Sequence, residues 1–121
     1  MKIKRVKIGI KSMANAMDDF VRTAEAVQRG ERRKKETGVY FTSMEAFRKA
    51  LTPQRLNLLR LIRKVNPASL HELARLAQRN IKNVSDDVKY LSQVGLIELK
   101  DSANRMSARV NYDKIMLEIA V

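Results

Sequence analysis

The sequence predicts an α+β protein that is mainly helical. Aromatic residues make up only 5% of the chain and Trp is absent, so the core must consist mostly of Leu, Ile, Val, Met and Ala, which favours helices. Apolar residues recur at helical spacing through the middle of the chain, and two-residue alternation appears near both ends. The length of 121 residues fits one domain with an accessory segment.

The charge of the chain indicates what kind of partner it binds. There are 25 Lys and Arg residues against 13 Asp and Glu residues, which gives a formal net charge of +12. A field of this sign favours a polyanion, and nucleic acid is the commonest one. An anionic membrane surface, an acidic protein partner and simple solubility are also compatible with it.

The sequence lacks the residues that several kinds of functional site require. Without Cys there are no disulfides or thiolate metal sites, and the single His71 has no second ligand for zinc, so we expect no metal and no cofactor. No nucleophile–base set or Gly-rich phosphate loop is present, so we assign no catalytic residues and do not expect an enzyme. Because no apolar run is long enough to span a bilayer or form a signal-peptide core, we expect a cytoplasmic protein.

Residues 1–36 predict a strand–helix arm followed by a basic linker. Residues 2–10 alternate in a β-branched run, which predicts a strand that needs a partner from elsewhere in the chain or from a second copy. A helix then starts at Ser12 and carries a narrow apolar stripe. The arm packs either on its own domain or between two copies, and we predict a dimer or partner interface. Its residues are Val6, Ile8, Ile10, Met13, Met17, Phe20, Ala24 and Val27.

The linker contains four consecutive cations, Arg32 to Lys35. It is either a solvated connector or a segment that touches DNA phosphates.

Residues 37–121 predict a second unit with well-marked helix starts. Thr42 begins a T-x-x-E capping box for a short helix over residues 44–51. Thr52 caps the next helix, with Pro53 at its first position, where the missing N–H has no cost. A second capping box at Ser69 opens a third helix.

A fourth helix over residues 80–94 follows after a short turn and ends at Gly95. Residues 97–112 then predict two strands joined by a polar turn at 101–105, and residues 115–121 predict a last strand that pairs with residues 2–10.

Consecutive helices joined by a short turn and followed by a hairpin describe a winged helix-turn-helix, here with an N-terminal strand–helix arm that dimerises. In that architecture helix 80–94 enters the major groove of double-stranded DNA and hairpin 97–112 is the wing. The side chains near the start of the helix meet base edges, and Arg79, Lys89 and Tyr90 hold phosphates. Arg105 at the wing tip enters the minor groove or touches the backbone. The predicted DNA contacts are Arg79, Lys82, Asn83, Ser85, Asp86, Lys89, Tyr90 and Arg105.

Two carboxylates in this helix need a separate explanation. Asp86 projects outward, where it either accepts a hydrogen bond from a cytosine amino group or pairs with Arg79, Lys82 or Lys89. Asp87 lies closer to the buried edge of the helix, and we expect it to form a local ion pair.

Residues 51–112 resemble winged-helix regulators of the MarR-like and ArsR-like class, chiefly in LTPQRLNLLRLIRK and PASLHELARLAQRNIKNVSDDVKYLSQVGLIEL. The whole chain is similar to a prokaryotic group of predicted transcriptional regulators. The group shares a leading strand ending in IG, an FTSMEAFRKALTPQRL-like entry and the KNVSDDVKYL segment. Many relatives carry a basic residue in place of Asp86. Some members resemble antitoxins encoded beside a small toxin.

Three functional hypotheses follow. The first is a dimeric DNA-binding repressor, because two-fold operators call for dimers. The second is an antitoxin that binds DNA with the same domain and covers a toxin protein with the arm or an exposed sheet edge. The third is a winged helix used only for protein assembly, which the +12 charge does not favour.

Overall fold

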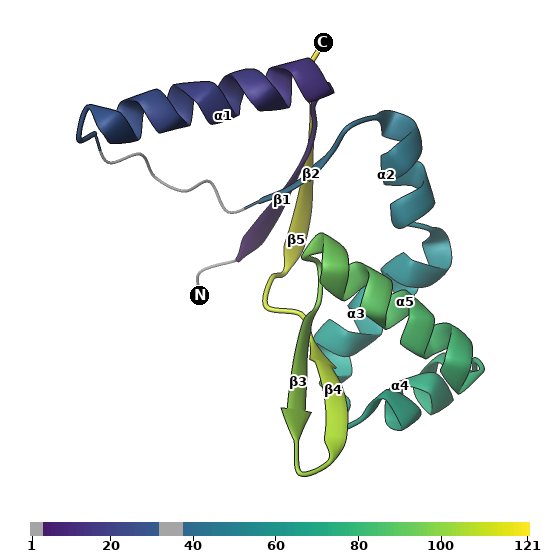
Figure 1. Cartoon of the computed structure of the whole chain (residues 1–121). Helices are drawn as coiled ribbons and strands as arrows, with labels where there is room; N and C mark the ends of the chain where they lie inside the picture. Colours follow the sequence, from purple (N-terminus) through teal and green to yellow (C-terminus); the bar gives the residue numbers. More distant parts are fainter. Residues whose placement is uncertain (1–3, 32–37) are drawn as a thin grey trace.

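A three-stranded parallel sheet joins the two ends of the chain (Figure 1). The structure, a computed structural model, describes residues 4–31 and 38–121, so the predicted linker cations lie outside the described residues. The strand β1 (Arg5–Ile10) lies in the centre, with β2 (Gly38–Phe41) on one side and β5 (Lys114–Ile119) on the other. The predicted pairing of the C-terminal strand with residues 2–10 is therefore confirmed, whereas β2 was not expected.

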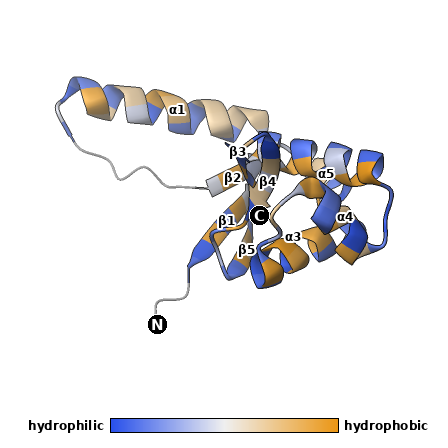
Figure 2. Cartoon of the chain, turned by 90° about the horizontal axis from the view of Figure 1, so that it is seen from below, coloured by the Kyte–Doolittle hydropathy of each residue, from blue (hydrophilic) through white to orange (hydrophobic). Residues whose placement is uncertain are grey.

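The helix α1 (Met13–Gln28) leads from β1 towards β2. The Ser12 hydroxyl accepts a hydrogen bond from the Asn15 amide at 3.2 Å, so the predicted cap is confirmed. Every residue of α1 except Ala26 is exposed, and Figure 1 shows the helix apart from α3, α4 and α5. Apolar residues recur along the length of α1 (Figure 2).

The four remaining helices follow in sequence: α2 (Met44–Ala50), α3 (Pro53–Val65), α4 (Leu70–Ala77) and α5 (Ile81–Val94). Thr52 caps α3 and Ser69 caps α4, each accepting from the amide three residues later, as predicted. The predicted cap of α2 is wrong. Ser43, not Thr42, accepts the hydrogen bond from the Ala46 amide, at 3.0 Å, so the cap lies one residue later than the T-x-x-E motif places it, whereas the helix begins at Met44 as predicted.

An antiparallel hairpin of β3 (Glu98–Ser102) and β4 (Arg105–Arg109) follows α5. The turn consists of Ala103 and Asn104 alone, with φ values of 50° and 64°. Because two left-handed residues reverse the chain in the least space, the strands run closer to the tip than the predicted turn over 101–105.

A single hydrophobic core lies between the sheet and the helices. Ile8 of β1 is fully buried in it, and β2 contributes Val39 and Phe41. The other buried residues come from the middle of the chain: Ala50, Leu58, Leu59, Ile62, Leu70, Leu73, Ala74, Val84, Val88, Leu91, Leu96, Ile97, Ala108 and Val110. The central strand of the N-terminal arm therefore packs with residues 37–121. The described part of the chain is an α+β fold with five helices and two small sheets.

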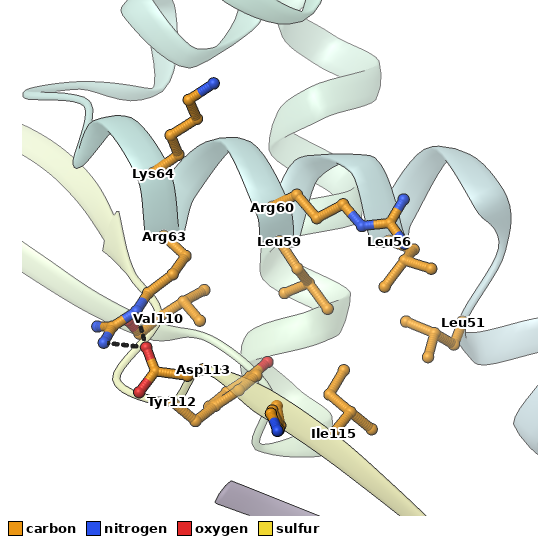
Figure 3. Close-up of a pocket in the computed structure, with 11 residues that line it drawn as sticks. Leu51, Leu56, Leu59, Arg60, Arg63, Lys64, Val110, Tyr112, Asp113 and Ile115 are labelled. Carbon is orange, nitrogen blue, oxygen red and sulfur yellow. Dashed lines mark hydrogen bonds and ion pairs between the residues drawn. The ribbon is translucent and has the colours of Figure 1, made fainter. Parts of the chain in front are cut away.

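The segment between β4 and β5 attaches the hairpin to both α3 and β1. Arg63 of α3 donates to the Asp113 carboxylate (Figure 3) and to the Val110 carbonyl, and Asp113 also accepts from the Lys4 amide. The Arg63 hydrogen bond, followed by that from Lys4, lowers the pKa of Asp113 below its usual value. Tyr112 donates its hydroxyl to the Leu96 carbonyl at 2.8 Å.

Burial raises the pKa of Tyr112 from 10.0 to about 12, and this predicts a stability change at alkaline pH. The unfolded tyrosine ionises first, so its contribution to folding stability is complete below pH 10 and is lost as the pH rises towards about 12. Tyr112→Phe should lower the free energy of unfolding by about 1 kcal/mol at neutral pH, because the Leu96 carbonyl loses its donor. Denaturant titrations should show this difference shrinking as the pH passes 10. A constant difference would contradict the assignment.

Candidate nucleic-acid interface

The helix α5 presents one buried and one exposed face. Val84, Val88 and Leu91 are fully buried in the core. The helix begins where the Asn80 side chain accepts from the Lys82 amide at 2.8 Å, and it ends at Gly95, which has a φ of 95°. Four of the predicted DNA-contacting residues lie on the exposed face: Lys82, Asn83, Asp86 and Lys89.

A shallow groove of about 270 Å³ separates α5 from the hairpin tip. Ser85 and Ile81 line it from α5, and Arg105 lines it from β4. The fold thus brings together Ser85 and Arg105, two predicted DNA-contacting residues that lie 20 positions apart. The rest of the lining comes from the start of α4 and from the hairpin: Ser69, Leu70, His71, Asn104 and Met106.

Asp87 connects α5 to two arginines on neighbouring segments of the chain. Its carboxylate accepts from Arg55 Nε at 3.1 Å and from Arg79 Nη2 at 2.8 Å. The predicted local ion pair of Asp87 is confirmed. The Asp87 side chain is only 16% exposed and those of Arg55 and Arg79 about as little, so water screens these contacts weakly.

Arg55 extends this network to two further elements. Its Nη1 donates to the carbonyls of Lys49 and Ala50 at the end of α2, and its guanidinium lies 4.2 Å from the ring centroid of Tyr90. Sequence analysis did not identify Arg55, because its partners are far away along the chain and no local motif marks it. One arginine thus connects α2, α3 and α5.

Arg79 and Tyr90, which were predicted to hold phosphates, are thus engaged within the protein. Arg79 is half-buried, and its Nη1 is buried without a hydrogen-bond partner among residues 4–31 and 38–121. Tyr90 is half-buried beneath Arg55. Their contacts with DNA remain predictions. Asp86 forms no ion pair among the residues that the structure describes, so it does not orient Arg79, Lys82 or Lys89 there.

The predicted interface residues divide into two groups. Val6, Ile8 and Ile10 face the core of their own chain. The α1 residues point to solvent: Met13 is 65% exposed, Met17 57%, Phe20 69% and Val27 64%, and Ala24 is exposed as well. Only the α1 part of the predicted interface is open to a partner in this structure.

Another hollow lies elsewhere, between α3 and β5 (Figure 3). It measures about 530 Å³ and contains none of the predicted DNA-contacting residues. Leu56, Leu59 and Ile115 line its apolar floor. Within the described segments, no three side chains of His, Cys, Asp or Glu gather as a metal ion would require. A search of those same segments finds no helix with the length and apolar character to span a membrane.

Comparison with known proteins matches the chain to a protein family. A family model described as HVO_A0114 matches residues 50–117, from the end of α2 through most of β5. The match includes α5, the hairpin and the whole groove between them. No curated protein matches the chain.

Removal of the Asp87 carboxylate tests whether this network supports the fold. Asp87→Asn should lower the free energy of unfolding by about 2 kcal/mol, because two poorly solvated guanidinium groups lose their charged acceptor. The neighbouring Asp86→Asn is the matched control, since Asp86 is exposed, and it should change stability by less than about 0.5 kcal/mol. Equal effects of the two substitutions in thermal or denaturant unfolding would rule out this role of Asp87.

Proposed function

The chain belongs to the HVO_A0114 family, and we propose that it is a sequence-specific DNA-binding transcription regulator of the winged helix-turn-helix type. The observation that carries this proposal is the combination of an exposed polar face on α5 with the hairpin tip beside it. Lys82 and Asn83 lie on that face, and Arg105 lies at the tip. A cation and an amide on the exposed face of this helix, with a second cation at the neighbouring hairpin tip, suit a DNA duplex.

The order α3, α4, α5 and hairpin supports the winged helix-turn-helix architecture. The turn between α4 and α5 is short because Gln78 adopts a left-handed conformation, with a φ of 54°, and Asn80 already caps the next helix. The 14 residues of α5 make a rod of about 21 Å, which fits lengthwise in a major groove. In this arrangement α4 supports α5, and the hairpin acts as the wing.

The two ends of the exposed face have different tasks in this proposal. Asn83 pairs with adenine through its amide, and Lys82 reaches the acceptors of guanine. Lys89, further along the helix, holds a phosphate, as does Arg105 unless it enters the minor groove. Asp86 lies between these cations and accepts from a cytosine amino group, which makes it a contributor to sequence selection more than to affinity.

The network around Asp87 sets the angle of α5 in this proposal. Base readout requires side chains to be placed within a fraction of an ångström, so the helix that carries them must be rigid. Arg55 and Arg79 hold Asp87 on the side of α5 away from solvent. Tyr90 is held in the same network by its stacking contact with Arg55.

A binding assay on the chain's own promoter tests the proposal. The double substitution Lys82→Ala with Asn83→Ala should reduce specific affinity by about 1 to 3 kcal/mol per lost base contact and relax sequence preference. Specific binding should also weaken steeply as salt rises, because phosphate contacts release counterions.

The matched control removes the same two residue types from exposed positions of α3. Asn57→Ala with Lys64→Ala takes away one amide and one positive charge, yet leaves α5 and the hairpin unchanged. It should leave the discrimination between specific and random DNA unchanged. If both double variants behave alike, α5 is not the reading helix, and if the protein ignores DNA at low salt, the function itself is wrong.

A second candidate function is that of an antitoxin, with the same DNA-binding surface. The exposed apolar face of α1 favours it, because a helix with four apolar residues more than half exposed fits the groove of another protein. The antitoxin would cover a toxin with α1 and repress its own operon.

Co-expression with a small reading frame adjacent to the gene tests this candidate. Wild-type protein should suppress the toxicity of that neighbour and co-purify with it, whereas Met17→Lys with Phe20→Lys should abolish both effects. The double variant should still bind operator DNA, since α1 lies apart from α5. Retained suppression by the variant would exclude α1 as the covering surface.

A further inference from the structure

Within the described residues, the outer edge of β5 is an unpaired sheet edge. β5 is the terminal strand of the order β2-β1-β5, so only its inner side pairs with β1 in the described part of the chain. Its register with β1 is unbroken from Lys114 to Ile119, with no bulge and no Pro. Soluble proteins ordinarily blunt such an edge, because its free amides and carbonyls attract other strands.

β5 carries exposed apolar side chains on both faces of the sheet. Leu117 is 44% exposed and Ile119 46% exposed, on the face that carries Ile8 towards the core. Met116 is 48% exposed on the opposite face. The strand thus offers backbone hydrogen-bonding groups and apolar side chains together, which is the combination that strand addition uses.

We propose that β5 pairs antiparallel with β5 of a second copy of this chain, so that two three-stranded sheets join into one continuous six-stranded sheet. The proposal goes beyond the DNA-binding function and does not depend on it. It also differs from the interface expected from the sequence, because the strand that was expected to contact a partner, β1, lies in the centre of its own sheet.

The requirement that the faces match limits the register. In a continuous antiparallel sheet, directly opposed residues lie on the same face. Along β5 one face carries the even-numbered residues and the other the odd-numbered ones, so two opposed residues are both even or both odd and their numbers add to an even total. A two-fold axis at Met116 satisfies this rule. It places Lys114 of each copy opposite Glu118 of the other, and Ile115 opposite Leu117.

Charge complementarity identifies a second copy as the occupant. The strand carries one cation and one anion, two residues on either side of Met116, so an antiparallel self-pair contains two opposite-charge pairs. Glu118 already contacts Lys7 of its own chain at 2.9 Å, and in the pair it would lie between Lys7 and the second Lys114. The neighbouring face brings apolar side chains together across the axis.

A charge-swap experiment tests this register. Lys114→Glu places two acids opposite each other twice per dimer, and Glu118→Lys does the same with two cations. Each variant alone should self-associate about tenfold more weakly than wild type, or worse, in sedimentation equilibrium. Both positions are exposed, so the circular dichroism spectra of the variants should match that of the wild type.

The two variants mixed in equal amounts should recover the dimer. Every opposed pair in the mixed species is then one Glu and one Lys, and native mass spectrometry should show a heterodimer at wild-type strength. A loss of folding or of solubility in the single variants cannot produce this rescue. The rescue requires that position 114 of one copy lies opposite position 118 of the other.

The control substitution is Phe20→Lys in α1, which removes an apolar side chain that is 69% exposed. It should leave the dimer intact. The proposal is overturned if the wild-type chain is monomeric without another protein, if the charge variants associate like wild type, if the mixture stays monomeric, or if only Phe20→Lys dissociates the dimer. Since none of these measurements contains DNA, they give the same answer whether or not the protein binds it.

Discussion

Asp87 orients the part of the structure on which the proposed function depends. Its carboxylate lies between Arg55 from the start of α3 and Arg79 from the turn before α5, and Arg55 also binds the last carbonyls of α2. Ion pairs with little solvent contact add modest net stability, because desolvation offsets much of their attraction, but they are directional. One carboxylate therefore sets the angle of α5 relative to three other segments, and with it the direction of Lys82 and Asn83.

The second constraint is that β1 must be paired on both sides. A strand of alternating β-branched residues near the start of the chain is not stable alone, so β2 and β5 meet it from positions about 30 and 110 residues later. The pairing of β1 with β2 and β5 attaches the N-terminal and C-terminal segments to the core that supports α5. In the part of the chain that the structure describes, it leaves the outer side of β5 unpaired and α1 apart from α3 to α5, and these two surfaces are the ones that we assign to protein partners.

The predictions from the sequence succeeded where the signal is local. Thr52 with Pro53, and Ser69 with Glu72, mark helix starts through hydrogen bonds that span only three residues. Gly95 marks the end of α5 because a left-handed residue is required there. The cap of α2 was misplaced by one position, because Thr42 and Ser43 are both good caps and only the path of the chain from β2 selects the second.

The sequence by itself determined the helices, the hairpin, the positive charge and the outward face of α5, since each depends on residues within a few positions or on composition. Tertiary structure alone decided that the sheet is parallel, that β2 exists, and that Ile8 packs inward. It also decided that Arg55 and Arg79 share Asp87 and that Ser85 faces Arg105 across a groove. The physical reason is distance along the chain: partners 20 to 110 residues apart meet only through packing, and no short pattern encodes which of many charged or β-branched residues will meet.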